Sequence, residues 1–183
     1  MKVKVYENAE TYLLDNETAL LEHEAVSQLV LYNAYQSRQS LGNDKGLFGI
    51  VIDEDQTVLH FSNMPSQCMA IYVQDGSKDI LEAARDLANF IADNQVKLEG
   101  INAINEVCEA FMEEYSKKVN CTFAERMATD IMEVRQLNEI KPAEGRTRLA
   151  IPHESKLLTD FMIQFQIEAM AKEINYESAL VKV

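Results

Sequence analysis

Two segments of this chain share one pattern: a short run of strand-forming residues, a polar cap, and then a long amphipathic helix. The first run is Lys2–Tyr6, followed by a helical stretch over Asn8–Ser37. The second run is Arg146–Ile151, followed by a helical stretch over His153–Glu173. A strand that leads into a helix is how many mixed domains begin. The repeat therefore predicts two domains, the second of which stops after its first helices.

Composition narrows the class of protein. With 183 residues, 47% of them hydrophobic, the chain can bury one full core and the start of another. No stretch approaches the ~20 apolar residues of a membrane span, and the N-terminus lacks the apolar core of a secretory signal. We therefore expect a cytoplasmic protein with no membrane partner. The net charge of −13 also argues against nucleic acid, because phosphate contacts need a basic face.

The residue types that bind metals are scattered along the chain. Its three cysteines are Cys68, Cys108 and Cys121, and its three histidines are His23, His60 and His153. Neither set has the close spacing of a zinc site, and the cysteines show no disulfide pattern. We expect no metal site, and cysteines that act as small apolar side chains.

The middle of the chain predicts a sheet. The runs Leu47–Ile52, Val58–Phe61 and Cys68–Val73 are rich in β-branched and aromatic residues, and the acidic turn Asp53–Gln56 separates the first two. These runs predict a three-strand antiparallel meander. The last run shows little alternation, which is typical of a strand covered on both faces.

The order of the remaining elements follows from periodicity. We expect a helix break at Asn16–Thr18, a helix over Lys78–Asn94, a strand within Leu98–Ile104 and a helix over Asn105–Lys118. The pattern of Cys121–Val134 fits either a strand or a helix, and we favour a strand. The predicted organisation is a first domain over residues 1–138, a linker over 139–147 and a truncated second domain over 148–183.

This order of elements resembles the GCN5-related N-acetyltransferase (GNAT) fold. Three stretches carry the likeness to bacterial tandem members of that family: LVLYNAY at Leu29–Tyr35, DIMEVRQLNEIKPAEGRTRLA at Asp130–Ala150, and DFMIQFQIEA at Asp160–Ala169. The resemblance implies an α/β (α+β) class with a mixed, mainly antiparallel sheet flanked by helices. It also implies that the parent protein transfers an acetyl group from acetyl-CoA to an amine acceptor of unknown identity.

The family's cofactor loop reads Gln/Arg-x-x-Gly-x-Gly/Ala, and its counterpart here is degenerate. Counting from Gln74 places Ser77 where the first glycine belongs and Asp79 where the last small residue belongs. Asp75 and Asp79 beside a diphosphate would each cost on the order of 1 kcal/mol. The resemblance therefore implies a cofactor-binding remnant at Gln74, Gly76 and Ser77 that does not hold acetyl-CoA. Gly76 is better interpreted as a turn residue.

The second predicted domain offers a candidate substrate-binding face. Phe161, Gln164 and Glu168 are spaced by three and four residues, so they share one helix face, and the resemblance places this helix beside the acceptor groove. The alternative is that Phe161 belongs to a core and Glu168 is a flanking acid. No residue of the chain matches a catalytic role in the family.

Three hypotheses for function remain open at this point. The chain is the N-terminal part of an acetyl-CoA-dependent N-acetyltransferase, or it is a non-catalytic structural domain that forms a homodimer. A carboxylate-based hydrolase would draw on pairs such as Glu113-Glu114 or Asp53 and Asp55, which are better interpreted as solvated acids. Serine hydrolase chemistry is disfavoured because the sequence has no Gly-x-Ser-x-Gly elbow.

Overall fold

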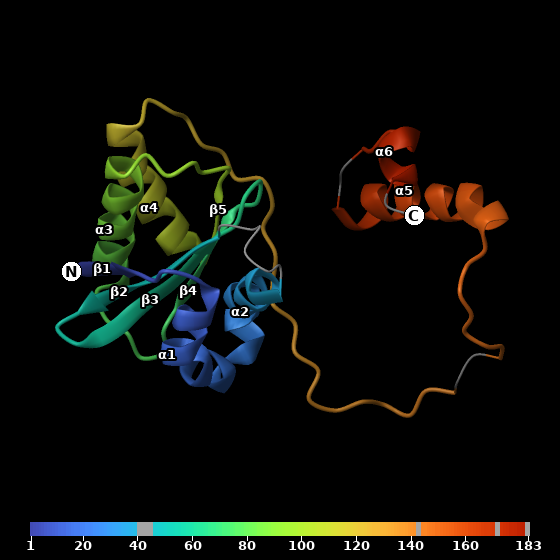
Figure 1. Cartoon of the computed structure of the whole chain (residues 1–183), viewed down its shortest axis with the longest axis horizontal. Helices are drawn as coiled ribbons and strands as arrows, with labels where there is room; N and C mark the ends of the chain where they lie inside the picture. Colours follow the sequence, from blue (N-terminus) through green and yellow to red (C-terminus); the bar gives the residue numbers. More distant parts are fainter. Residues whose placement is uncertain (40–45, 142–143, 171–172, 182–183) are drawn as a thin grey trace. The chain divides into compact units, whose positions relative to one another are not determined.

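The computed structural model describes residues 1–39, 46–141, 144–170 and 173–181. By its internal contacts the chain divides into two compact units, unit 1 (Met1–Arg135) and unit 2 (Gln136–Val183) (Figure 1). The division into domains over 1–138 and 148–183 with a linker between them stays a prediction.

Unit 1 is built on a five-stranded sheet. Its strands are β1 (Lys2–Val5), β2 (Leu47–Asp53), β3 (Gln56–Asn63), β4 (Met69–Val73) and β5 (Ile101–Asn102). They lie side by side in that order, and every neighbouring pair is antiparallel except β4 and β5, which are parallel. The predicted meander and its turn are confirmed. The strand predicted within Leu98–Ile104 is confirmed as well, although only two of its residues pair.

Helices cover both faces of this sheet (Figure 1). Helices α1 (Ala9–Glu22) and α2 (Glu24–Gln39) pack on one face, whereas α3 (Ile80–Asp93) and α4 (Asn105–Lys118) pack on the other. Strand β4 shows the consequence: Ala70 and Tyr72 are buried against the first pair of helices, and Met69 and Ile71 against the second. Coverage on both faces explains why this strand lacks an alternating pattern.

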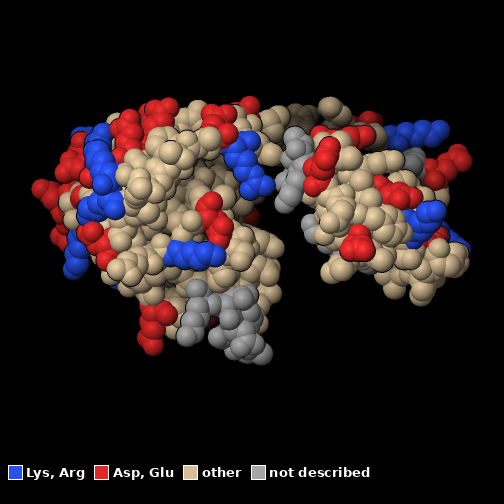
Figure 2. All heavy atoms as spheres, turned by 90° about the horizontal axis from the view of Figure 1, so that it is seen from above, with Lys and Arg blue, Asp and Glu red and all other residues tan. Residues whose placement is uncertain are grey.

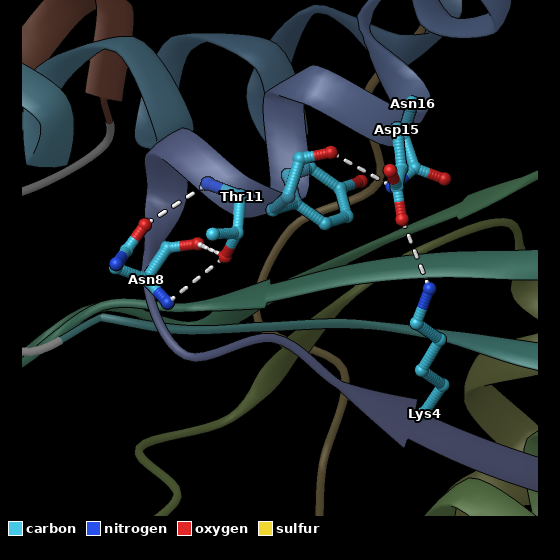
Figure 3. A network of polar contacts seen from close by, with 6 residues as sticks. Lys4, Asn8, Thr11, Asp15 and Asn16 are labelled. Carbon is cyan, nitrogen blue, oxygen red and sulfur yellow. Dashed lines mark hydrogen bonds and ion pairs between the residues drawn. The ribbon is translucent and has the colours of Figure 1, made fainter.

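Local chemistry sets the start and end of α1. Asn8 caps the helix: its side-chain oxygen accepts from the Thr11 backbone N–H, and the Thr11 hydroxyl faces the Asn8 backbone (Figure 3). The predicted break at Asn16–Thr18 is wrong. Asn16 instead donates its side-chain amide to the Tyr12 carbonyl within the helix, and the break falls at His23, which leaves helical geometry.

Two predicted strands do not form. Residues 122–134 are exposed and have no strand partner within the described parts of the chain, so the strand predicted over Cys121–Val134 is wrong. The strand predicted over Arg146–Ile151 is also wrong, because no strand among the described residues pairs with it; the Arg148 guanidinium there bonds to the Glu154 carboxylate. A run of strand-forming residues becomes a strand only where a ladder satisfies its backbone groups.

Unit 2 consists of helices. A 3₁₀ turn (Pro152–Glu154) leads into α5 (Ser155–Met170), which packs against α6 (Tyr176–Leu180). The long helix predicted over His153–Glu173 is confirmed over Ser155–Met170, whereas Glu173 lies outside the helix. The chain is therefore of mixed α+β class, with a mostly antiparallel sheet in unit 1. None of the helices in the described residues has the length and apolar character needed to cross a bilayer.

Candidate functional site

A chain of hydrogen bonds runs from the core of unit 1 to its surface. The Tyr12 hydroxyl lies 3.1 Å from Nδ1 of His60, and Nε2 of His60 lies 3.0 Å from Oε1 of Gln74. Because an amide oxygen can only accept, Nε2 carries the hydrogen and Nδ1 accepts from the tyrosine hydroxyl. Helix α1, strand β3 and the residue after β4 are thereby joined through one neutral imidazole.

Burial keeps the titratable side chains of this hydrogen-bonded series uncharged. His60 is 1% exposed, and burial lowers its pKa from 6.5 to about 4, against a smaller opposing effect of its bond to Gln74. The phenol of Tyr12 is fully buried, and the same desolvation raises its pKa. Both groups are therefore uncharged at neutral pH.

Strand register explains the aromatic packing beside His60. His60 on β3 lies directly opposite Tyr72 on β4, and their rings stack with centroids 5.7 Å apart. The Tyr72 hydroxyl is buried and has no hydrogen-bond partner among the described residues, and burial raises its pKa. Its acidic neighbour is Asp75, in the turn that follows β4.

The turn after β4 connects this sheet to α3. The Ser77 backbone N–H bonds to the Gln74 carbonyl at 3.2 Å, and Gly76 has φ of +74°. A glycine with positive φ in the third position is typical of a type II turn, in agreement with its interpretation as a turn residue. Asp79 precedes α3 in a left-handed conformation, and its side chain makes no capping bond to the helix.

This turn forms one side of a surface pocket of about 360 Å³. The second half of α1 and the start of β3 form the other sides. The lining residues are Asp15, Asn16, Ala19, Gln56, Thr57, His60, Gln74, Asp75, Gly76 and Ser77. The sequence-predicted remnant Gln74, Gly76 and Ser77 therefore lies together in the structure, beside a histidine and two carboxylates.

The electrostatics of the pocket are set by its acids. Asp15 accepts a 3.0 Å bond from the ammonium of Lys4 on β1, which lowers the pKa of this exposed carboxyl (Figure 3). Asp75 is 77% exposed at the side chain, and its carboxylate lies 3.9 Å from Nε2 of His23. On the face of unit 1 seen in Figure 2, acidic side chains are spread among basic ones, and no continuous basic surface is visible.

The predicted substrate-binding residues lie on α5 in unit 2. Phe161, Gln164 and Glu168 are all exposed, and Phe161 is 56% exposed. Phe161 lines an apolar hollow of about 390 Å³ with Leu158, Met162 and Phe165, to which neither Gln164 nor Glu168 contributes. The interpretation of Phe161 as a core residue is wrong for the described residues. Its role in substrate binding stays a prediction.

Sequence reasoning missed the residues that tie the pocket together. Tyr12, Asn16 and His60 were treated as helix, cap and scattered histidine, respectively. The available signal was a histidine inside the apolar run Val58–Phe61, because a polar residue in a buried strand needs a partner. No group of three or more His, Cys, Asp or Glu residues able to hold a metal occurs in the described part of the chain.

Comparison of the chain with protein-family models, with curated proteins and with solved structures found no match.

Proposed function

We propose that unit 1 is an acetyltransferase-like domain with a non-catalytic, supporting role, at the N-terminal end of an acetyl-CoA-dependent N-acetyltransferase. The element order of unit 1 supports this: a strand, two helices, a meander, a helix, a strand and a helix, with β4 and β5 parallel. This is the order that the resemblance to the GNAT family implies, except that the final strand expected over Cys121–Val134 is missing from the described residues. The acyl acceptor would be an amine, and the compartment the cytoplasm.

The observation that carries the supporting role is the turn between β4 and α3. Asp75 lies in the turn and Asp79 immediately precedes α3, where the family would place bare backbone N–H groups against a diphosphate. A carboxylate at each of these positions would repel a diphosphate by on the order of 1 kcal/mol. The left-handed geometry of Asp79 also suits glycine better than aspartate.

Isothermal titration of the chain with acetyl-CoA tests this proposal. We expect no saturable heat with the natural sequence. The double variant Ser77→Gly/Asp79→Gly restores the Gln-x-x-Gly-x-Gly pattern from Gln74, and we expect it to gain measurable affinity. The matched control Ser116→Gly/Glu113→Gly makes equivalent exchanges on α4 and should gain none. Micromolar binding by the natural chain would refute the supporting role.

A second candidate function, self-association, is favoured by α5. Leu157, Phe161, Phe165 and Ile167 are each more than half exposed, which is a larger apolar area than isolated surface residues usually present. We propose that a second copy of this chain covers this helix. Sedimentation velocity should show a concentration-dependent dimer, and Phe161→Glu should yield monomer. The neighbouring exchange Gln164→Glu adds the same charge on the same helix and should leave the dimer intact. A monomer at all concentrations would refute this candidate.

A further inference from the structure

The turn after β4 contains two neighbouring residues that can react with each other. Asp75 is followed by Gly76, and no other glycine of the chain follows an aspartate or an asparagine. In an Asp-Gly pair the backbone nitrogen of the glycine can attack the aspartate carboxyl, because glycine has no Cβ to block the approach. Whether the pair reacts in a folded protein depends on how tightly the fold holds it.

The fold leaves both reacting groups accessible. The Asp75 side chain is 77% exposed, and the 3.9 Å between its carboxylate and Nε2 of His23 is beyond hydrogen-bond distance. The Gly76 N–H donates no hydrogen bond to any described residue, whereas the Ser77 N–H beside it bonds to the Gln74 carbonyl. Apart from its chain neighbours, no heavy atom lies within 4 Å of the position that a Cβ at Gly76 would occupy.

The turn also provides the motion that the reaction needs. Gly76 has φ of +74°, as in the third position of a type II turn. Type II and type I turns differ mainly by a rotation of the central peptide, which takes ψ of the second residue from about +120° to about −30°. Here that peptide joins Asp75 to Gly76, so its rotation carries the glycine nitrogen past the aspartate carboxyl. Both turn types keep the bond from the Ser77 N–H to the Gln74 carbonyl.

We propose that Asp75-Gly76 is a site of isoaspartate formation. The Gly76 nitrogen attacks Cγ of Asp75 and a C–N bond forms, while the carboxyl loses a hydroxyl and the amide a proton, which leave together as water. Water then opens the five-membered succinimide. Opening at the side-chain carbonyl restores aspartate, and opening at the main-chain carbonyl gives isoaspartate. The reaction goes beyond the proposed function, because it involves neither acetyl-CoA nor unit 2.

Isomerisation changes the turn beside the buried hydrogen-bond series. In isoaspartate the main chain passes through the former side chain, so the turn becomes longer by one carbon atom. Gln74 directly precedes this position, and its Oε1 lies 3.0 Å from Nε2 of His60. We therefore expect the longer turn to displace Gln74 and to shift the ring proton resonances of His60 in the NMR spectrum.

Ageing in water labelled with oxygen-18 tests the proposal, because each opening of the ring adds one labelled oxygen. The full chain is kept for several weeks at neutral pH and physiological temperature, digested, and measured by mass spectrometry. We expect about tenfold more label at Asp75 than at Asp55, which is exposed in the turn between β2 and β3 but precedes Gln56. Protein L-isoaspartate O-methyltransferase with S-adenosylmethionine should methylate the aged chain, because it esterifies the isoaspartyl carboxyl.

Matched variants assign the reaction to this turn. Asp75→Glu keeps the charge but requires a six-membered ring, which closes much more slowly, so label and methylation should be lost. Asp55→Glu makes the same exchange in the other turn and should leave both unchanged. Incubation in urea gives the rate that the sequence alone sets, and the folded chain should react no more than about tenfold more slowly, since exposed turns are held loosely.

Three results would overturn the proposal. One is equal label at Asp75 and Asp55, or none at either position. Another is label that appears in urea but not in the folded chain, which would show that the turn holds the pair in an unreactive geometry. The third is label without methylation, which would show that the ring always reopens to aspartate.

Discussion

Protonation of His60 is expected to destabilise unit 1 as the pH falls below neutral. In the folded protein the pKa of this imidazole is about 4, because it is buried, whereas the unfolded chain returns it to 6.5. Between pH 4 and pH 6.5 the His60 imidazole is therefore protonated in the unfolded state but mostly neutral in the folded state. The stability that His60 contributes is therefore complete above pH 6.5 and is lost as the pH falls toward 4.

The size of the effect follows from the two pKa values. Their difference, multiplied by the 1.36 kcal/mol that one pKa unit represents, is about 3 kcal/mol, of which about 2 kcal/mol is lost by pH 5. That is a large part of the 5–15 kcal/mol typical of a domain. Protonation would also place a hydrogen on Nδ1, where the Tyr12 hydroxyl now donates, so the hydroxyl would have to turn.

Urea unfolding at pH 7, 6 and 5 measures this loss, with His60→Gln as the variant. Glutamine has no titrating group, so the stability advantage of the natural chain over the variant should shrink by about 2 kcal/mol from pH 7 to pH 5. The control Val58→Ala truncates another buried residue of β3 and should destabilise equally at all three values. A difference between natural chain and His60→Gln that stays constant with pH would refute the reasoning. The histidine ring proton resonance, followed by NMR in the folded chain, gives the pKa directly.

Three further predictions concern stability and pairing. Gly49→Ala should destabilise unit 1 by about 2 kcal/mol or more, because the added Cβ would lie 2.6 Å from the Lys4 carbonyl oxygen and would clash with the Phe61 ring; thermal unfolding checks it. Asn8→Ala should cost about 1 kcal/mol through loss of the α1 cap, and Asn8→Ser should restore most of it in the same assay. Backbone amides of residues 122–134 should exchange with solvent much faster than those of β3, and slow exchange there would reinstate the predicted strand.

The sequence predicted correctly those elements whose ends are set by residues close to them in the chain. The helix over Asn105–Lys118 has the predicted limits, and the polar cap predicted at the start of the first helix is Asn8. The acidic turn Asp53–Gln56 was identified because two strand-forming runs flank it. In each case the information lies within a few residues, and no distant contact is needed to decide the structure.

Elements that depend on a distant partner were predicted less well. Cys121–Val134 has the residues of a strand, but a strand also needs a free edge at the right place, and sequence periodicity cannot supply that. The expected break at Asn16–Thr18 failed for a similar reason. Asn16 has the composition of a cap, yet its position against the sheet holds it inside α1, where its amide bonds to the helix carbonyl.

The pocket could not be predicted because its residues come from three separate parts of the chain. Asn16 lies on α1, His60 on β3 and Asp75 in the turn after β4, and only the pairing of β3 with β4 and the packing of α1 on the sheet bring the three to one pocket. From the sequence of the turn alone we could predict only that it does not bind a diphosphate, because its two acidic residues would repel one. Neutralising Asp75 alone removes one of the two repulsive charges but leaves Ser77 and Asp79 where the family places its glycines, so Asp75→Asn should not by itself restore acetyl-CoA binding in the same titration.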